Sequence, residues 1–309
     1  MKDLSIVIPI YNEEEVLPIL MKRIDSAFNS IDFSYELVFV NDGSQDSSLD
    51  RLLLYKNERS NITIVNLSRN FGHQAAITAG LEHSKSKSVV IIDADLQDPP
   101  ELIPKLVNEW RKGFQVVDCI RTSRKESLIR KFLFNSFYKL FNMFIGDRIG
   151  IMSGVYGLMD RVVVDHLINL KEKNRFIPGL RNWIGFSKTS IMYERDERQA
   201  GKPQQSIINL FKYGFDAIFS FSYLPLRFSW IFGSFVSVMA FLLATVLIIF
   251  RVFNINVVLG FTTQAVLILF IGGIQLITIG IIGEYIGRIY DEVKQRPLYI
   301  IENIYKNDL

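Results

Sequence analysis

Three carboxylates follow a short apolar run in the first half of the chain. Val89 to Ile92 is a run of β-branched residues, and Asp93, Asp95 and Asp98 come directly after it. Such a run is typical of a strand buried on both faces, and ligands bind at the carboxyl ends of strands in open α/β sheets. Asp93 and Asp95 can share a hard divalent cation with the oxygens of a diphosphate. The alternative is an ordinary polar loop, in which Asp98 caps the next helix.

A second set of polar residues predicts contacts to a nucleotide. Asp42 can accept hydrogen bonds from the imide N–H of a pyrimidine base or from a ribose hydroxyl, and Gly43 lets the backbone come close. Arg69 and the free N–H groups near Gly72 offer positive potential to phosphate. An ordinary turn at residues 41–44 is the alternative. The sequence contains neither a dinucleotide-binding glycine motif nor a P-loop.

These residues fall in the turns of an alternating pattern of strands and helices. We expect strands at 4–10, 35–40, 62–67, 89–92 and 115–120, and helices at 11–28, after Asp46 or Ser47, at 72–84 and at 100–112. The alternation predicts an α/β fold with a mostly parallel, doubly wound sheet, and it puts every one of these turns at the same edge.

Four motifs in this order carry a family resemblance. They are Val7-Ile-Pro-Ile-Tyr-Asn-Glu-Glu, Val40-Asn-Asp-Gly-Ser-Gln-Asp, Leu67-Ser-Arg-Asn-Phe-Gly-His and Asp93-Ala-Asp-Leu-Gln-Asp-Pro. The chain resembles family 2 glycosyltransferases with a GT-A fold, and more narrowly the polyprenyl-phosphate glycosyltransferases of the bactoprenol glucosyltransferase and dolichyl-phosphate mannose synthase type. The resemblance extends over nearly the whole chain.

The resemblance implies substrates, a cofactor and site residues. The implied donor is a nucleotide sugar, UDP-glucose or a related UDP-sugar. The implied acceptor is polyprenyl (undecaprenyl) phosphate, and the implied cofactor is Mg²⁺ or Mn²⁺. The implied nucleotide-sugar site is Pro9, Tyr11, Asn12, Glu13, Asp42, Arg69, Gly72, Asp93, Ala94, Asp95 and Gln97. Asp93, Asp95 and Gln97 would face the metal and the diphosphate.

The sequence departs from this family at the position often proposed as catalytic base. Where relatives carry Gly-Asp-Phe-Arg, this chain reads Gly154-Val155-Tyr156-Gly157. Asp147 is the candidate replacement, together with Asp93 and Asp95 as catalytic residues. A sugar hydroxyl needs a general base, whereas a phosphate monoester, with a second pKa of about 6, already carries an oxyanion near neutral pH. Loss of the base is therefore compatible with a lipid phosphate acceptor.

Composition limits the other classes of function. The net charge of +3 is too small to indicate a nucleic-acid partner. His73, His83 and His166 are scattered without the spacing of a zinc site. Cys119 lies in an apolar run, so we expect a buried structural thiol.

The second half of the chain has the pattern of a membrane protein. Runs 228–250 and 261–283 are uncharged, and each has about 23 residues, enough to cross roughly 30 Å of hydrocarbon. Cations flank the pair, which predicts cytoplasmic termini. Residues 121–146 read as a basic and aromatic interfacial helix, or alternatively as a core-packing helix with a solvated basic face. Its cations and one later arginine are candidates for holding the acceptor phosphate: Arg121, Arg124, Arg130, Lys131 and Arg198.

The predicted organisation has four parts. A cytosolic domain would span 1–200, a juxtamembrane amphipathic helix 201–227, two transmembrane helices 228–283 and a cytosolic tail 284–309. The protein would be a multi-pass protein of the inner membrane, and small residues at Gly272, Gly273, Gly280 and Gly283 favour a homo-oligomer. A processive polysaccharide synthase and a non-catalytic membrane scaffold are the alternatives. The first usually has more spans, and the second gives no reason to keep Asp42, Asp93, Asp95 and Gln97 together.

Overall fold

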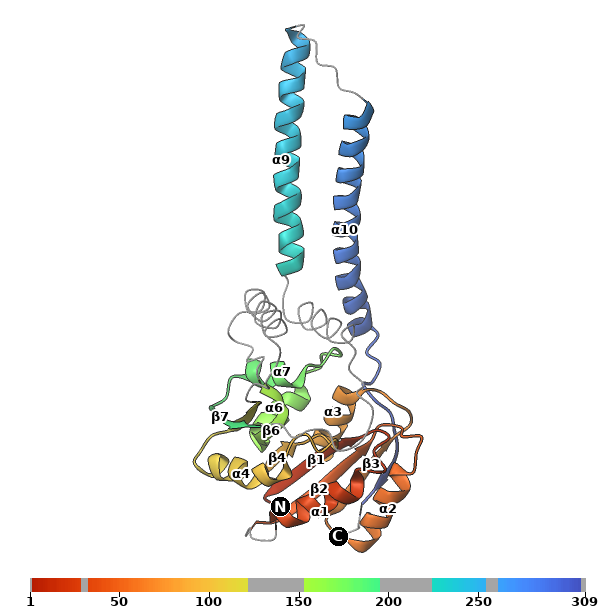
Figure 1. Cartoon of the computed structure of the whole chain (residues 1–309), viewed down its shortest axis with the longest axis vertical. Helices are drawn as coiled ribbons and strands as arrows, with labels where there is room; N and C mark the ends of the chain where they lie inside the picture. The colour runs from red at the N-terminus through yellow and green to blue at the C-terminus, as the bar shows by residue number, and fades with distance from the viewer. Residues whose placement is uncertain (1, 29–32, 122–152, 195–223, 254–260, 307–309) are drawn as a thin grey trace. The chain divides into compact units, whose positions relative to one another are not determined.

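The computed structural model describes residues 2–28, 33–121, 153–194, 224–253 and 261–306. The chain divides into two compact units (Figure 1). The first consists of Met1–Leu210 with Pro297–Leu309, and the second of Phe211–Arg296. The predicted interfacial helix at 121–146 and most of the predicted juxtamembrane helix lie outside the described residues.

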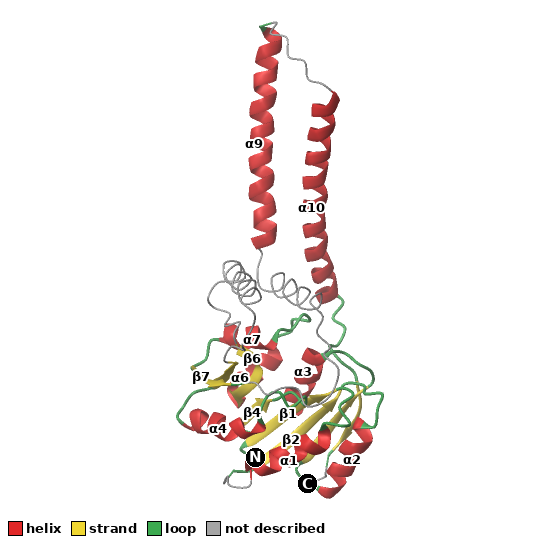
Figure 2. Cartoon of the chain, in the orientation of Figure 1, coloured by secondary structure: helices red, strands yellow, loops and turns green. Residues whose placement is uncertain are grey.

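A mixed sheet forms the centre of the first unit. Within the described residues it has eight strands in the order β7-β5-β6-β4-β1-β2-β3-β8. Four of its seven strand pairings are parallel. Figure 2 shows the strands of this sheet in yellow. The strands are β1 (Leu4–Ile10), β2 (Tyr35–Asn41), β3 (Ile62–Leu67), β4 (Ser88–Ile91), β5 (Val116–Arg121), β6 (Ser153–Asp160), β7 (Lys188–Tyr193) and β8 (Ile301–Tyr305). The mostly parallel sheet predicted from the sequence is confirmed.

Helices cover both faces of this sheet. They are α1 (Leu17–Phe28), α2 (Ser48–Glu58), α3 (His73–His83), the 3₁₀ turn η1 (Pro100–Leu102), α4 (Ile103–Arg111), α6 (Arg161–Asn169) and α7 (Ile177–Ile184). Apolar residues of α1, α2 and α4 share one buried cluster with Ile6 and Ile8 of β1. Because neighbouring strand residues point to opposite faces, Val7 faces the other layer, where Gly80 of α3 packs on it.

The alternation of strands and helices predicted through residue 120 is confirmed, from β1 to β5. Other expectations differ from the structure. In the sheet, β6 lies between β4 and β5 and runs antiparallel to both, so these two strands are not neighbours. The first helix starts at Leu17 and not after Tyr11, so it has no acidic first turn. Residues 11–16 instead form part of a network of loops, described below. In addition, the segment expected to be a tail contains β8, which pairs antiparallel with β3.

The second unit contains two long helices, α9 (Leu224–Val252) and α10 (Phe261–Val293). Both are long and apolar enough to cross a membrane. Large apolar side chains such as Phe228, Trp230 and Leu276 are exposed along them. The last turns of α10 are charged and carry an ion pair between Arg288 and Glu284 at 2.8 Å. The helices therefore present apolar surface to their surroundings over most of their length, as expected for lipid-facing segments.

Candidate active site

Four loops meet at the carboxyl ends of the parallel strands β1 to β4. Asn12, after β1, donates its backbone N–H to Ser44 Oγ at 3.1 Å, and its Oδ1 accepts from the backbone of Gln45 at 2.8 Å. Asn12 has a φ of 55°, a left-handed conformation that asparagine tolerates better than most residues. The loops after β1 and β2 are thus joined directly, as the shared sheet edge predicted.

Carboxylates and hydroxyls complete this junction. Glu13 donates its backbone N–H to Ser48 Oγ at 2.9 Å, and Glu14 donates to Asp46 at 3.2 Å. Asp46 also accepts from the backbone of Ser48 at 3.0 Å. Because side chains of the second loop satisfy these N–H groups, residues 12–14 do not need a helix to pair their backbone, which explains the late start of α1.

Asp42 holds the loop after β3. Its two carboxylate oxygens accept from the backbone N–H groups of Phe71 at 2.7 Å and Gly72 at 3.0 Å. Burial raises the pKa of Asp42, and these two hydrogen bonds oppose that rise. A carboxylate has about four acceptor positions, so capacity is left for a nucleoside. The backbone approach predicted for Gly43 is made to this loop, since a Cβ there would lie 2.4 Å from Arg69 C.

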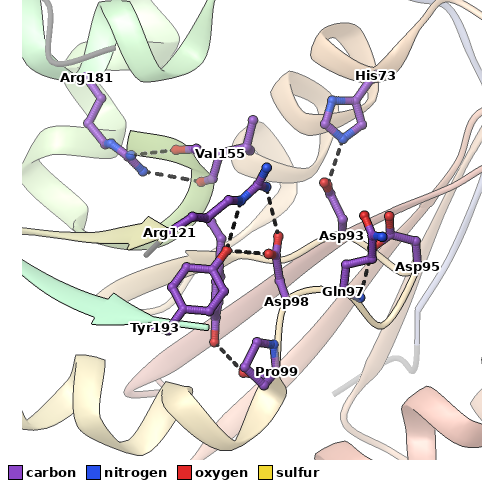
Figure 3. A network of polar contacts seen from close by, with 12 residues as sticks. His73, Asp93, Asp95, Gln97, Asp98, Pro99, Arg121, Val155, Arg181 and Tyr193 are labelled. Atoms are coloured by element: carbon purple, nitrogen blue, oxygen red, sulfur yellow. Dashed lines mark hydrogen bonds and ion pairs between the residues drawn. The ribbon is translucent and has the colours of Figure 1, made fainter. Parts of the chain in front are cut away.

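The acidic loop after β4 has two faces. Asp93, Asp95 and Gln97 are half-buried, whereas Ala94, Leu96 and Asp98 are buried. Figure 3 shows the side chains of Asp93, Asp95 and Gln97 on one side of the loop and Asp98 on the other. Leu96 has a φ of 59°, and this left-handed residue turns the chain between the two halves of the motif. The predicted metal-facing residues are therefore together.

His73 is a member of this cluster that we did not predict. Its Nε2 lies 2.8 Å from Asp93 Oδ1, and it is the first residue of α3 (Figure 3). Burial disfavours the charged imidazole, but the carboxylates around it, Asp93 foremost, outweigh this and raise the pKa of His73. The available signal was its position at the end of the third motif, directly after Gly72.

The acidic loop fits a metal site that a substrate completes. Within the described ranges, no group of three or more His, Cys, Asp or Glu side chains is arranged to hold a metal ion by itself. Mg²⁺ is usually bound through one or two carboxylates, with substrate phosphates and water as the other ligands. Asp93 and Asp95 supply two carboxylates, and the amide of Gln97 lies beside them. This set matches a site in which substrate phosphates and water provide the other metal ligands.

Asp98 lies in a buried network and does not cap the next helix, whose N-cap has no side-chain hydrogen bond. The Tyr193 hydroxyl, on β7, donates to Asp98 and accepts from Arg121 Nε at 3.1 Å. Arg121 Nη2 lies 3.6 Å from Asp98 Oδ2. Burial, and then the charge of Asp98, raises the pKa of the Tyr193 phenol. Arg121, predicted as a phosphate ligand, is thus fixed at the end of β5, beside the acidic loop (Figure 3).

The segment that departs from the family pattern is held by a second buried arginine. Arg181 of α7 is fully buried, pairs with Asp118 at 2.6 Å and donates to Gly154 O at 2.9 Å and Val155 O at 3.3 Å. A Cβ on Gly157 would lie 2.9 Å from Arg181 Nη1 and 2.7 Å from Val117 O. A larger residue therefore does not fit at 157, and Arg181 occupies the space beside it.

Apart from Arg121, which is described above, the predicted residues fall into three groups. The four loops contain Tyr11, Asn12, Glu13, Asp42, Arg69, Gly72, Asp93, Asp95 and Gln97. Pro9 and Ala94 are buried, so their side chains point into the protein. Asp147, Arg124, Arg130, Lys131 and Arg198 lie outside the described residues. Sequence reasoning missed His73, Arg181 and Tyr193.

Comparison with known proteins agrees with this geometry. The Glycosyl transferase family 2 profile matches residues 5–168. The chain belongs to glycosyltransferase family 2. An uncharacterized glycosyltransferase of Bacillus subtilis (strain 168) is 42% identical over 302 residues, covering 97% of this chain and 94% of the relative.

Two relatives have names that state an acceptor. The bactoprenol glucosyl transferase of Shigella phage SfX is 37% identical over 301 residues, which cover 97% of this chain and 99% of the relative. The undecaprenyl-phosphate 4-deoxy-4-formamido-L-arabinose transferase of Yersinia enterocolitica is 39% identical over 311 residues, covering 98% and 94%. The predicted family, its GT-A fold and the assignment as a glycosyltransferase are therefore confirmed.

Proposed function

We propose that this glycosyltransferase moves a hexose from a nucleotide sugar, a UDP-sugar, to polyprenyl phosphate. The observation that carries the proposal is the face of Asp93, Asp95 and Gln97, beside the loops that Asp42 joins. The names of the phage SfX and Yersinia enterocolitica relatives support the lipid phosphate as acceptor.

On the donor side, Asp42 accepts a hydrogen bond from the nucleoside, and Arg69 with the start of α3 faces the diphosphate. Asp93, Asp95 and the Gln97 amide would hold Mg²⁺ or Mn²⁺, which when bound supplies Lewis acid stabilisation of the departing diphosphate. His73 keeps the Asp93 carboxylate oriented through its 2.8 Å contact. The residues of this side thus bind the donor and stabilise the charge that develops on its leaving group.

On the acceptor side, the reaction needs a nucleophile and no general base. An oxygen of the lipid phosphate attacks the anomeric carbon, the bond from that carbon to the diphosphate breaks, and the diphosphate leaves with the electron pair, inverting the configuration. Arg121, held by Asp98 and Tyr193, is a cation for the acceptor phosphate. Val155 in place of a carboxylate agrees with an acceptor that already carries an oxyanion.

The second unit would anchor the enzyme in the cytoplasmic membrane. Helices α9 and α10 supply two spans, with both termini in the cytoplasm, because cations flank the pair. A Cβ on Gly272, Gly273, Gly280 or Gly283 would meet nothing within 4 Å, so α10 can pack closely against a helix of a second copy. A homo-oligomer follows as part of this proposal.

The test uses the purified full-length chain in detergent with Mn²⁺ and labelled UDP-sugars. Undecaprenyl phosphate is the acceptor, and undecaprenol, which lacks the phosphate, is the matched control. We expect one labelled lipid with the phosphate acceptor and none with the alcohol. A growing polymer would support the processive synthase, and absence of product with every donor would support the scaffold.

A further inference from the structure

The strand β8 joins the sheet of the first unit after the two long helices of the second. It pairs antiparallel with β3, and its first residues therefore lie at the carboxyl end of β3, where the site is. Figure 1 shows this C-terminal strand beside β3. Ser68, in the loop after β3, donates its backbone N–H to Ile300 O at 3.0 Å. The C-terminal segment thus contacts a loop of the nucleotide site.

Glu302 sits at an irregularity in this pairing. Asn66 is paired with Asn303 and Leu67 with Ile301, so Glu302 is an extra residue on β8. Bulges of this kind redirect a side chain and are common next to active sites. The Glu302 carboxylate accepts from Asn66 Nδ2 at 2.9 Å.

Two buried amides continue the connection. Asn66 Oδ1 accepts from Asn41 Nδ2 at 2.7 Å, and both residues are less than 5% exposed. A carboxylate can only accept, so Asn66 must turn its NH₂ group toward Glu302 and its oxygen toward Asn41. Asn41 must then donate its NH₂ group, which leaves its own oxygen as an acceptor. Glu302 therefore fixes the orientation of both buried amides.

The connection ends in the loops of the nucleotide site. Asn41 Oδ1 accepts from the backbone N–H of Ser44 at 3.3 Å. Ser44 Oγ in turn accepts from the backbone N–H of Asn12 at 3.1 Å. Asp42, the proposed nucleoside ligand, lies between Asn41 and Ser44. The orientation that Glu302 imposes thus reaches the loops on both sides of the proposed base site.

We propose that Glu302 is a positioning residue of the donor site, and that the segment after the second long helix belongs to that site. The proposal rests on the proposed function, in which Asp42 binds the nucleoside. Without the Glu302 carboxylate, Asn66 can rotate its amide by 180°, Asn41 then loses its fixed partner, and the turn at Ser44 loosens. The donor binds less well, while the acceptor side, formed by other strands, is unaffected.

The first experiment measures donor binding. UDP with Mn²⁺ is titrated calorimetrically into the full-length chain in detergent, for wild type and for Glu302→Ala, Glu302→Gln and Asn303→Ala. We expect Glu302→Ala to weaken UDP binding by about fivefold to tenfold, an effect the size of the net contribution of one ordinary hydrogen bond, because the lost contact acts on the site indirectly. Glu302→Gln can present its amide oxygen to Asn66 Nδ2, and the Ser44 N–H still requires the Asn41 oxygen, so both buried amides keep their orientation and UDP should bind nearly as in wild type. Asn303→Ala, on the same strand, should also bind nearly as wild type.

The second experiment tests the hydrogen-bonded connection from Glu302 to Ser44 independently of the identity of the donor. Amide hydrogen exchange is followed without nucleotide, and we expect residues 41–46 to exchange faster in Glu302→Ala and at the wild-type rate in Glu302→Gln. An unchanged exchange rate of residues 41–46 in Glu302→Ala would contradict the proposed connection from Glu302 through Asn66 and Asn41 to Ser44. An equal loss of protection from exchange in the alanine and glutamine variants would contradict it too. If the wild-type chain binds no UDP but Glu302→Ala still exchanges faster at residues 41–46, the proposed donor is wrong and the connection from Glu302 to Ser44 is supported.

Discussion

At the scale of single residues, the acidic loop separates two tasks between neighbouring carboxylates. Asp93 and Asp95 are half-buried on one side, and Asp98 is buried on the other, among Tyr193 and Arg121. Leu96, in a left-handed conformation, allows both orientations within six residues. The chemistry available to each carboxylate is therefore decided by its side of the loop and not by its residue type.

Replacement of Asp95 by asparagine tests the first task. Asp95→Asn keeps the size of the side chain but removes a charge that would bind the metal. We expect transfer to fall by more than about a hundredfold, since loss of an outer-shell partner alone costs about tenfold to a hundredfold. Mn²⁺ binding, measured by calorimetry with UDP present, should weaken in parallel, while the melting temperature stays the same.

The matched control is Asp50→Asn, an exposed carboxylate on α2. It should change neither transfer nor Mn²⁺ binding. Full activity of Asp95→Asn would remove the metal hypothesis.

Removal of the Tyr193 hydroxyl tests the second task. Tyr193→Phe takes from the buried Asp98 carboxylate a hydrogen-bond donor and leaves Arg121 without its Nε acceptor. We expect the unfolding free energy to fall by about 1–3 kcal/mol, the usual effect of an unsatisfied buried polar group. The KM for the lipid phosphate should rise at saturating donor, with an unchanged KM for the donor.

Tyr55→Phe on α2, which packs against the same core, is the control for loss of a phenol hydroxyl. An equal rise of both KM values in Tyr193→Phe would mean that Arg121 has no separate role on the acceptor side.

At the scale of elements, the loops stabilise one another more than they follow the preferences of their own sequences. The strands were predictable because short runs of β-branched residues, such as those of β1 and β4, indicate buried strands. The start of α1 was not, because Ser48 and Asp46, more than 30 residues away, satisfy the backbone of residues 13 and 14.

The parts of the site that the sequence did not predict have the same cause. Arg181 and Tyr193 belong to α7 and β7, which come later in the sequence than residues 122–152 and pack beside the site. No local sequence pattern identifies these two residues. Strand β8 follows a long apolar segment, and its five residues alternate too weakly to identify a strand partner. His73 was adjacent to a recognised motif, but its contact with Asp93 depends on how α3 and β4 lie together.

Gly43 offers a test of how tightly the loops are joined. Gly43→Ala must adopt a φ of 67° and place a Cβ 2.4 Å from the backbone of Arg69. We expect a loss of more than about 1 kcal/mol of stability from the backbone conformation alone, and in addition a displaced loop and weaker UDP binding.

Gly113→Ala is the matched control, since its φ is 102° but a Cβ there meets nothing within 4 Å. It should lower the melting temperature without changing UDP binding. Equal UDP affinities for the two variants would show that contact between these loops does not shape the donor site.

At the scale of the whole molecule, the order of the chain constrains its topology. Residues up to Leu210 and from Pro297 onward belong to one unit, and both long helices lie between them. If the two helices cross a membrane, the start of α9 and the end of α10 must therefore be on the same side, because β8 is paired with β3 in one sheet. This argument does not use the distribution of cations. It puts both ends of the helix pair on one side of the membrane, and the proposed cytoplasmic side rests on the cations.

Cysteine labelling in whole cells tests this topology. Cys119 is the one cysteine of the chain, is 1% exposed and has a pKa raised by burial, so it should not react with a maleimide in the folded protein. We expect a membrane-impermeant maleimide to label Asn254→Cys, in the connector between the helices, from outside the cytoplasmic membrane. Lys306→Cys, next to β8, should be labelled only after permeabilisation, and the wild-type chain in neither case. Labelling of both introduced cysteines from outside, or of neither, would contradict a two-helix hairpin whose ends both lie on the side of the first unit.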